Sequence, residues 1–130
     1  MNCSNNISGG VLIDTLSSNF NSLVNDELDY PLECVSALSL LNYRRFDVLA
    51  KYLYATYQDR GIKSNFAREV YIDHIRAFNN FVEADGSGKV GEESFIKSMD
   101  ILLNSLRDNG FSSLAPIPIS RDGVILDGAH

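Results

Sequence analysis

The sequence predicts an α+β chain in which a mostly helical N-terminal region is followed by a short β-hairpin. Two observations lead to this prediction. Apolar residues recur at helical spacing in three segments between residues 45 and 108, as expected for helices with one buried face. After Gly110 the pattern becomes extended, because the two prolines in the Ala-Pro-Ile-Pro-Ile stretch at 115–119 exclude a helix there.

The composition limits the classes of function. The 130 residues suit one domain, and a hydrophobic fraction of 45% is enough for a buried core. A net charge of −6 argues against nucleic acid as a partner over a broad surface, since such contact needs a basic face. No run of about 18 apolar residues is present, so no membrane span is expected. Cys3 and Cys34 lie far apart without a CxxC pair, which favours reduced thiols in a cytoplasmic protein.

The first 42 residues give the weakest signals. Residues 1–10 are polar and rich in glycine, so we expect a loose end there. Residues 11–30 mix apolar and polar positions without a clear period. Pro31 is expected to open a short helix over residues 31–42, because proline suits the first helical turn.

Three clear helices follow. The first runs from Arg45 to a stop at Gly61, with an apolar stripe of Phe46, Leu49, Ala50, Leu53 and Tyr57. The second starts after a cap at Ser64 and ends near Phe81, with a stripe of Ala67, Tyr71, Ile75, Phe78 and Val82. The third runs from about Glu92 to Asp108 and ends at Gly110, with a stripe of Phe95, Met99, Leu102, Leu103 and Leu106.

Extended structure is expected at the end of the chain. The residue pattern predicts a strand, a turn and a second strand over Ile117 to Leu126, with a tight turn at Arg121-Asp-Gly. An isolated hairpin is marginally stable in water, so these strands need further sheet. The chain before the third helix, residues 1–90, is predicted to be the helical N-terminal region.

The glycine-rich segment between the second and third helices is a candidate ligand loop. A calcium loop starting at Glu83 would need a bidentate glutamate at its last position, where Ser94 stands. The GxxxxGK[ST] spacing of a phosphate-binding P-loop is also absent. The segment therefore predicts a helix–helix turn, in which glycine amides and Lys89 could still hold one anionic group.

The last four residues, Asp-Gly-Ala-His at 127–130, form the main candidate site. Gly128 after a strand allows close approach of a ligand to the backbone. Asp127 could act as a base or hold a metal ion, and His130 could bind a phosphate oxygen or carry a proton. The alternative is a plain β-turn with an incidental histidine.

Residues 95–130 resemble the start of the ParB/sulfiredoxin-like superfamily. The matching pieces are Ser105-Leu106 with Gly110, then Pro-Ile-Pro-Ile at 116–119, and finally Leu-Asp-Gly-Ala-His at 126–130. The resemblance covers about the last 36 residues, and it implies that residues 91–130 are the start of an incomplete module. The superfamily's arginine would follow His130, so we expect the chain to be the front part of a longer protein.

The resemblance implies a nucleotide- or phosphate-binding function. Gly128, Ala129 (through its amide) and His130 would bind the phosphates of a nucleoside triphosphate or diphosphate, with Lys89 as a further contact. Asp127 and His130 would be catalytic, and Asp127 would hold Mg²⁺, if the parent protein transfers a phosphoryl group to a small molecule; Asp85 is a second candidate acid. Ala129 replaces the cysteine of the sulfinic-acid reductases, so that activity is not expected.

Two other functions stay open. One is a non-catalytic, nucleotide-gated DNA-partition or adaptor module, which the acidic charge balance disfavours as a DNA binder. The other is a structural helical domain without a ligand. The DGSGK turn also looks like proteins of bacterial surface-polysaccharide clusters that carry this module.

Overall fold

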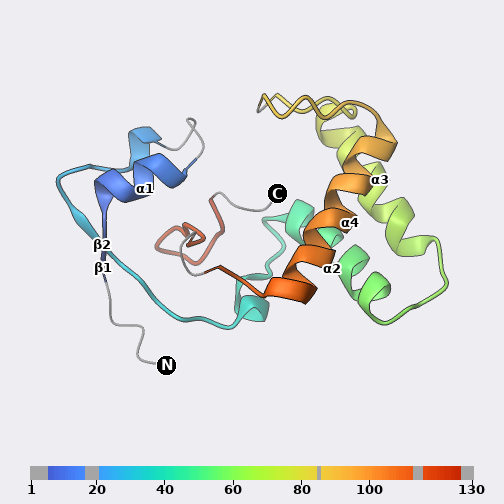
Figure 1. The fold of residues 1–130 in the computed structure, drawn as a ribbon, viewed down its shortest axis with the longest axis horizontal. Helices are drawn as coiled ribbons and strands as arrows, with labels where there is room; N and C mark the ends of the chain where they lie inside the picture. The colour runs from blue at the N-terminus through green and yellow to red at the C-terminus, as the bar shows by residue number, and fades with distance from the viewer. Residues whose placement is uncertain (1–5, 17–20, 85, 113–115, 127–130) are drawn as a thin grey trace. The chain divides into compact units, whose positions relative to one another are not determined.

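The computed structural model describes residues 6–16, 21–84, 86–112 and 116–126. The chain divides into two compact units, one of Tyr43–Phe111 and one that combines Met1–Asn42 with Ser112–His130. Helices dominate, and β1 and β2 form a two-stranded antiparallel sheet, which confirms the predicted α+β class (Figure 1). The elements in chain order are β1 (Asn6–Ser8), α1 (Gly9–Thr15), the 3-10 helix η1 (Asn21–Leu23), β2 (Asp29–Pro31), the 3-10 helix η2 (Ala37–Leu40), α2 (Phe46–Asp59), α3 (Phe66–Asn79) and α4 (Glu92–Asn109).

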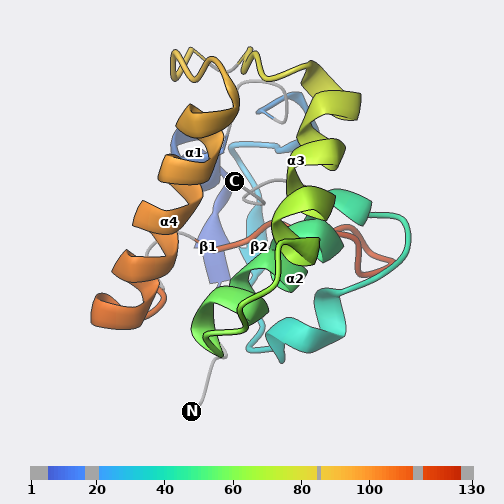
Figure 2. The same cartoon turned by 90° about the vertical axis from the view of Figure 1, so that its right-hand side faces the viewer.

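The helical unit is built from α2, α3 and α4. Its three helices lie within two residues of the predicted bounds, and the loop between α3 and α4 lies at one end of the unit (Figure 2). Because α4 packs in the same core as α2 and α3, the three predicted stripes bury one another. The core residues are Tyr54, Tyr71, Ile72, Ile75, Phe95 and Met99, with Phe81, Ile96, Leu102 and Leu103 packed against them.

Local signals explain where these helices stop. Asn80 adopts a left-handed backbone conformation with φ of 50°, which ends α3. Gly110, with φ of 73°, ends α4, and its amide donates to the carbonyl of Leu106 at 2.9 Å. Glu92 and Glu93 occupy the first turn of α4, where negative charge is favourable.

Four members of the predicted stripes are exposed. Phe46 is 57% exposed, Phe78 76%, Val82 54% and Leu106 41%. Val82 lies beyond the end of α3, so helical spacing no longer applies to it. In α3, Ile72 faces inward beside Tyr71 and Ile75, and this rotation of the packed face leaves Phe78 outside.

Two predictions for residues 1–42 are wrong. Residues 6–10 are not a loose end, because β1 and the start of α1 lie there. Pro31 does not open a helix. It ends β2 opposite Asn6, a sheet-edge position that proline tolerates, and the only helical turn within residues 31–42 is η2. Gly9 is required by close packing, since a Cβ atom there would lie 1.9 Å from the carbonyl oxygen of Asn25.

Cys34 forms a disulfide bond, so the prediction of reduced thiols is wrong. The spacing of the two cysteines could not show this, because β1 and β2 are distant in sequence and pair only in the folded chain. In the described ranges, no helix combines the length and the apolarity that crossing a membrane requires.

Candidate functional site

The segment before the candidate phosphate site folds back on itself at the predicted turn, but one isolated antiparallel bridge replaces the two predicted strands. Ile119 and Ile125 form an antiparallel bridge, and the amide of Leu126 donates to the carbonyl of Pro118 at 2.9 Å. The amide of Ser120 donates to the carbonyl of Val124 at 2.8 Å. Paired, extended backbone therefore continues to Leu126, the residue before the Asp-Gly-Ala-His sequence.

The turn of this hairpin is held by side chains as well. The hydroxyl of Ser120 donates to the Asp122 carboxylate at 2.6 Å and accepts from the amide of Val124 at 3.0 Å. Gly123 takes a φ of 79°, which a residue with a side chain rarely adopts. The predicted site residues Asp127, Gly128, Ala129 and His130 lie outside the described residues, so their roles stay predictions.

The loop between α3 and α4 is the helix–helix turn that the sequence predicts. Val82 and Val90 form an antiparallel bridge across it, and the amide of Glu83 donates to the carbonyl of Lys89 at 3.0 Å. Lys89 Nζ lies 3.7 Å from Glu83 Oε2 and 5.3 Å from the centre of the Phe95 ring. The carboxylate that would be the first calcium ligand is therefore paired with an ammonium group. Asp85 lies outside the described residues.

A half-buried set of charges lies on α2 and this loop. We call it the Lys51 cluster, and it consists of Arg45, Asp47, Lys51, Glu83 and Lys89. Two hydrogen bonds of 2.7 and 2.8 Å join the guanidinium of Arg45 to the Asp47 carboxylate. Lys51 Nζ lies 4.0 Å from the same carboxylate, and its side chain is only 18% exposed.

The electrostatics of this cluster centre on Lys51. Burial lowers the pKa of the Lys51 amine, with the positive charges of Arg45 and Lys89 adding to the effect; Asp47 and Glu83 oppose it. Burial alone would raise the pKa of Asp47, but its hydrogen bonds to Arg45 and the nearby positive charges hold that pKa below its ordinary value. In this cluster the charged form of the Asp47 carboxyl group is favoured, and the charged form of the Lys51 amine is disfavoured.

An aromatic ridge lies beside the cluster. It consists of Phe46, His74 and Phe78, whose ring centres lie 5.9 Å apart for the first pair and 6.0 Å for the second. Burial lowers the pKa of His74, and the charge of Lys51 adds to this while Asp47 opposes it. His74 is half-buried, although both phenylalanines are exposed.

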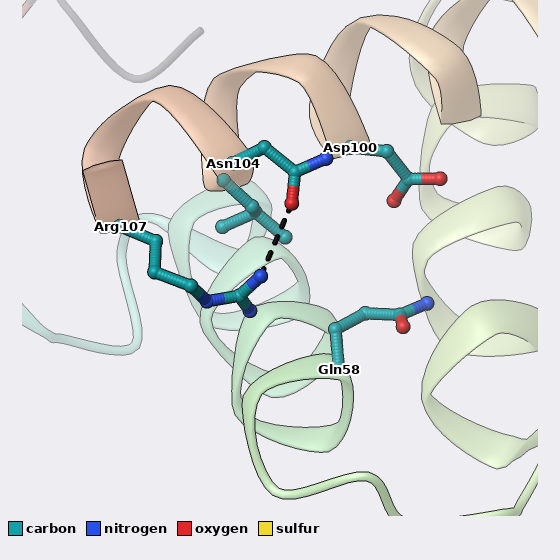
Figure 3. Close-up of a pocket in the computed structure, with 5 residues that line it drawn as sticks. Gln58, Asp100, Asn104 and Arg107 are labelled. Atoms are coloured by element: carbon teal, nitrogen blue, oxygen red, sulfur yellow. Dashed lines mark hydrogen bonds between the residues drawn. The ribbon is translucent and has the colours of Figure 1, made fainter. Parts of the chain in front are cut away.

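A depression of about 260 Å³ lies between α2 and α4, and Figure 3 shows its polar side chains converging. The buried hydroxyl of Tyr54 donates to Asp100 at 2.8 Å and accepts from Gln58 at 3.0 Å. Arg107 donates to Asn104 at 3.1 Å. Burial and the Asp100 hydrogen bond raise the pKa of Tyr54 to about 12. The hydrogen bond from Tyr54 to Asp100 joins α2 to α4, so we assign the depression a structural role.

Sequence reasoning did not identify Lys51 or the Tyr54–Asp100 pair as special. The partner of the Tyr54 hydroxyl is 46 residues away, and no local pattern points to it. Lys51 did leave a signal: it follows the buried Ala50 and stands four residues after Asp47, a spacing at which helix side chains meet.

Within residues 6–16, 21–84, 86–112 and 116–126, no three histidine, cysteine, aspartate or glutamate side chains gather in a metal-binding group. Asp127, the predicted Mg²⁺ ligand, is outside these ranges. The chain matches no protein-family model, no curated protein and no solved structure.

Proposed function

We propose that this chain binds the phosphates of a nucleotide through Gly128, Ala129 and His130, as its resemblance to the ParB/sulfiredoxin-like superfamily implies. The supporting observation is the hairpin of Pro118–Leu126, in which paired backbone leads directly to Asp127. A glycine at the end of such a strand admits a phosphate group close to the backbone. If a helix follows, its unpaired amides carry most of the interaction with the anion.

The two side chains have separate roles in this proposal. His130 adds one hydrogen bond to a phosphate oxygen, charge-assisted when the imidazole is protonated. Asp127 would hold Mg²⁺ or act as a base if a phosphoryl group passes to a small-molecule substrate. The proposed activity is therefore nucleotide binding, with phosphotransfer as its catalytic form.

The test compares nucleotide affinity and stability in the natural protein. His130→Ala should weaken ATP or ADP binding roughly ten- to hundred-fold, because a hydrogen bond to a charged group contributes about 1.5–3 kcal/mol. Gly128→Val should have a larger effect, since its side chain would occupy the space of the phosphate. Gly10→Val is the matched control, because a Cβ atom added at Gly10 would meet nothing within 4 Å. Calorimetry gives the affinity and thermal unfolding gives the stability. Wild-type affinity in His130→Ala, or its unfolding, contradicts the proposal.

A second candidate is a nucleotide-gated adaptor without catalysis. The observation in its favour is the aromatic ridge, where Phe46 and Phe78 are more than half exposed. Exposed aromatic residues are typical of surfaces that bind other proteins. Measuring nucleotide turnover in the presence of Mg²⁺ and a broad range of small acceptors separates the two candidates. An adaptor would bind the nucleotide without transferring its phosphate.

A further inference from the structure

A second depression, of about 460 Å³, lies between the C-terminal halves of α2 and α4. It adjoins the depression of Figure 3, since Leu103 and Arg107 line both. Its volume is within the range of about 300–1,000 Å³ that is typical of small-molecule sites. All of its lining residues belong to the helical unit, so this site is independent of residues 127–130.

Apolar side chains line much of this depression. Tyr52 and Leu106 lie in it and are 45% and 41% exposed, and Ala55 and Leu103 lie beside them. An apolar ligand that covers these side chains removes their surface from water, which is favourable. The lining therefore favours a ligand with an apolar body.

Arg60 is the charged residue of this depression that is available to a ligand. Within the part of the chain that the structure describes, its guanidinium makes no hydrogen bond or ion pair. It is not needed to cap the end of α2, because the carbonyls at residues 56–58 already accept hydrogen bonds from the backbone amides at residues 60–62. All the donors of this guanidinium are therefore open to an anion.

The charges that line the depression sum to one positive charge. Asp59 and Arg107 also line it, and Arg107 Nη2 lies 3.8 Å from Asp59 Oδ1. This pair is neutral as a whole, so the net charge of the lining comes from Arg60. A guanidinium group binds a carboxylate or a similar anion through two parallel hydrogen bonds.

We propose that this depression binds a small amphiphilic anion, such as a free medium-chain carboxylate. The apolar chain of the ligand lies against Tyr52 and Leu106, and its anionic group is bound by Arg60. Apolar contact and the charge of Arg60 contribute separately, so each can be removed by a variant that leaves the other in place. The helical unit then has a ligand of its own, besides the nucleotide proposed for residues 128–130.

The experiment uses two probes that share the same aromatic rings. 1-Anilinonaphthalene-8-sulfonate is negatively charged, and N-phenyl-1-naphthylamine is its neutral counterpart. Titration of the full chain, followed by probe fluorescence, should show saturable binding of both probes. Decanoate should displace the sulfonate probe, because it also combines an apolar chain with one negative charge.

Three variants assign the roles. Arg60→Gln should weaken binding of the sulfonate probe roughly three- to fivefold, as expected for a partly exposed ion pair, and leave the neutral probe unchanged. Leu106→Ser should weaken both probes. Lys97→Gln is the matched control for charge, because Lys97 is an exposed residue of α4 that does not line the depression, and it should change neither affinity. Thermal unfolding of each variant checks that it is folded.

Several results overturn the proposal. One is wild-type protein that shows no saturable binding of the sulfonate probe below about millimolar, and another is wild-type affinity in Arg60→Gln, whatever Leu106→Ser does. Binding that is lost in Phe78→Ser but kept in Leu106→Ser would place the probe on the aromatic ridge instead. Co-sedimentation with phosphatidylglycerol vesicles that Arg60→Gln abolishes, without displacement of the probe by decanoate, would replace the free anion by a membrane surface.

Discussion

The helical unit and the unit that contains the hairpin are stabilised in different ways. In the helical unit, side chains from α2, α3 and α4 fill one core, and Tyr54, Ala67 and Tyr71 are at most 4% exposed. In the described part of the other unit, Leu12 and Ile125 are the buried apolar residues. That unit is joined mainly by backbone hydrogen bonds in short strands and turns, and Cys34 adds a disulfide.

This difference matters for the proposed function, because the ligand site that we propose would lie in a different part of the sequence from the main core. Burial of apolar side chains is the main source of folding free energy, so the helical unit carries most of it. The hairpin leads to the proposed phosphate site and has little core of its own. A ligand bound there would therefore add a large share of that segment's stability.

The largest effect is expected from a core truncation in the helical unit. Phe95→Ala should lower the free energy of unfolding by about 3–5 kcal/mol, because it removes a side chain that is 5% exposed and leaves a cavity. Phe78→Ala is the matched control, since that phenylalanine is 76% exposed, and it should cost less than about 0.5 kcal/mol. Urea denaturation followed by circular dichroism measures both, and similar losses would show that the core is not where we place it.

A smaller effect is expected from the buried hydroxyl of Tyr54. Tyr54→Phe should cost about 1–2 kcal/mol, because it leaves Asp100 and Gln58 without their shared partner. The folded-state pKa of about 12 is raised above the ordinary value near 10, so the folded state favours the protonated hydroxyl. Its contribution is complete below pH 10 and is lost as the pH rises through 12.

Unfolding measured between pH 8 and 12 checks this sign. The difference in stability between wild type and Tyr54→Phe should shrink with rising pH in that range. Tyr43→Phe serves as the control, because Tyr43 is 86% exposed. A difference that grows with pH would contradict the role of the Tyr54 hydroxyl as a donor.

No effect is expected from calcium. Ser94 lacks the carboxylate that the last position of a calcium loop supplies, and Glu83 is paired with Lys89. Titration with Ca²⁺ followed by calorimetry should show no saturable binding below about millimolar, the range of weak natural modules. A micromolar transition that disappears in Asp85→Ala would mean that the loop is a calcium site after all.

The accuracy of the sequence predictions follows the same division. Helical periodicity located α2, α3 and α4, because burial of one face recurs every three to four residues and glycine or asparagine marks the ends. The prolines and the Arg121-Asp-Gly turn located the hairpin. Pro31 was misread because a proline is compatible with both a helix start and a sheet edge, and only the partner strand β1 distinguishes them.

Contacts between residues that are distant in the sequence could not be predicted from it. The pairing of Tyr54 with Asp100 and the gathering of Lys51 with Glu83 and Lys89 depend on how the helices pack. Phe78 shows the same limit within one helix, since a small rotation of the packed face decides whether a stripe residue is buried or exposed.

Amide hydrogen exchange of the intact protein tests the difference between the two units most directly. The amides of Tyr71–Ile75 in α3 and of Phe95–Met99 in α4 should exchange slowest, because they open only when the shared core opens. The amides of Ser120 and Leu126 should exchange much faster, although both are hydrogen-bonded within the hairpin. Equal protection of Ser120, Leu126 and the core amides, without added nucleotide, would contradict the assignment of stability to the helical unit.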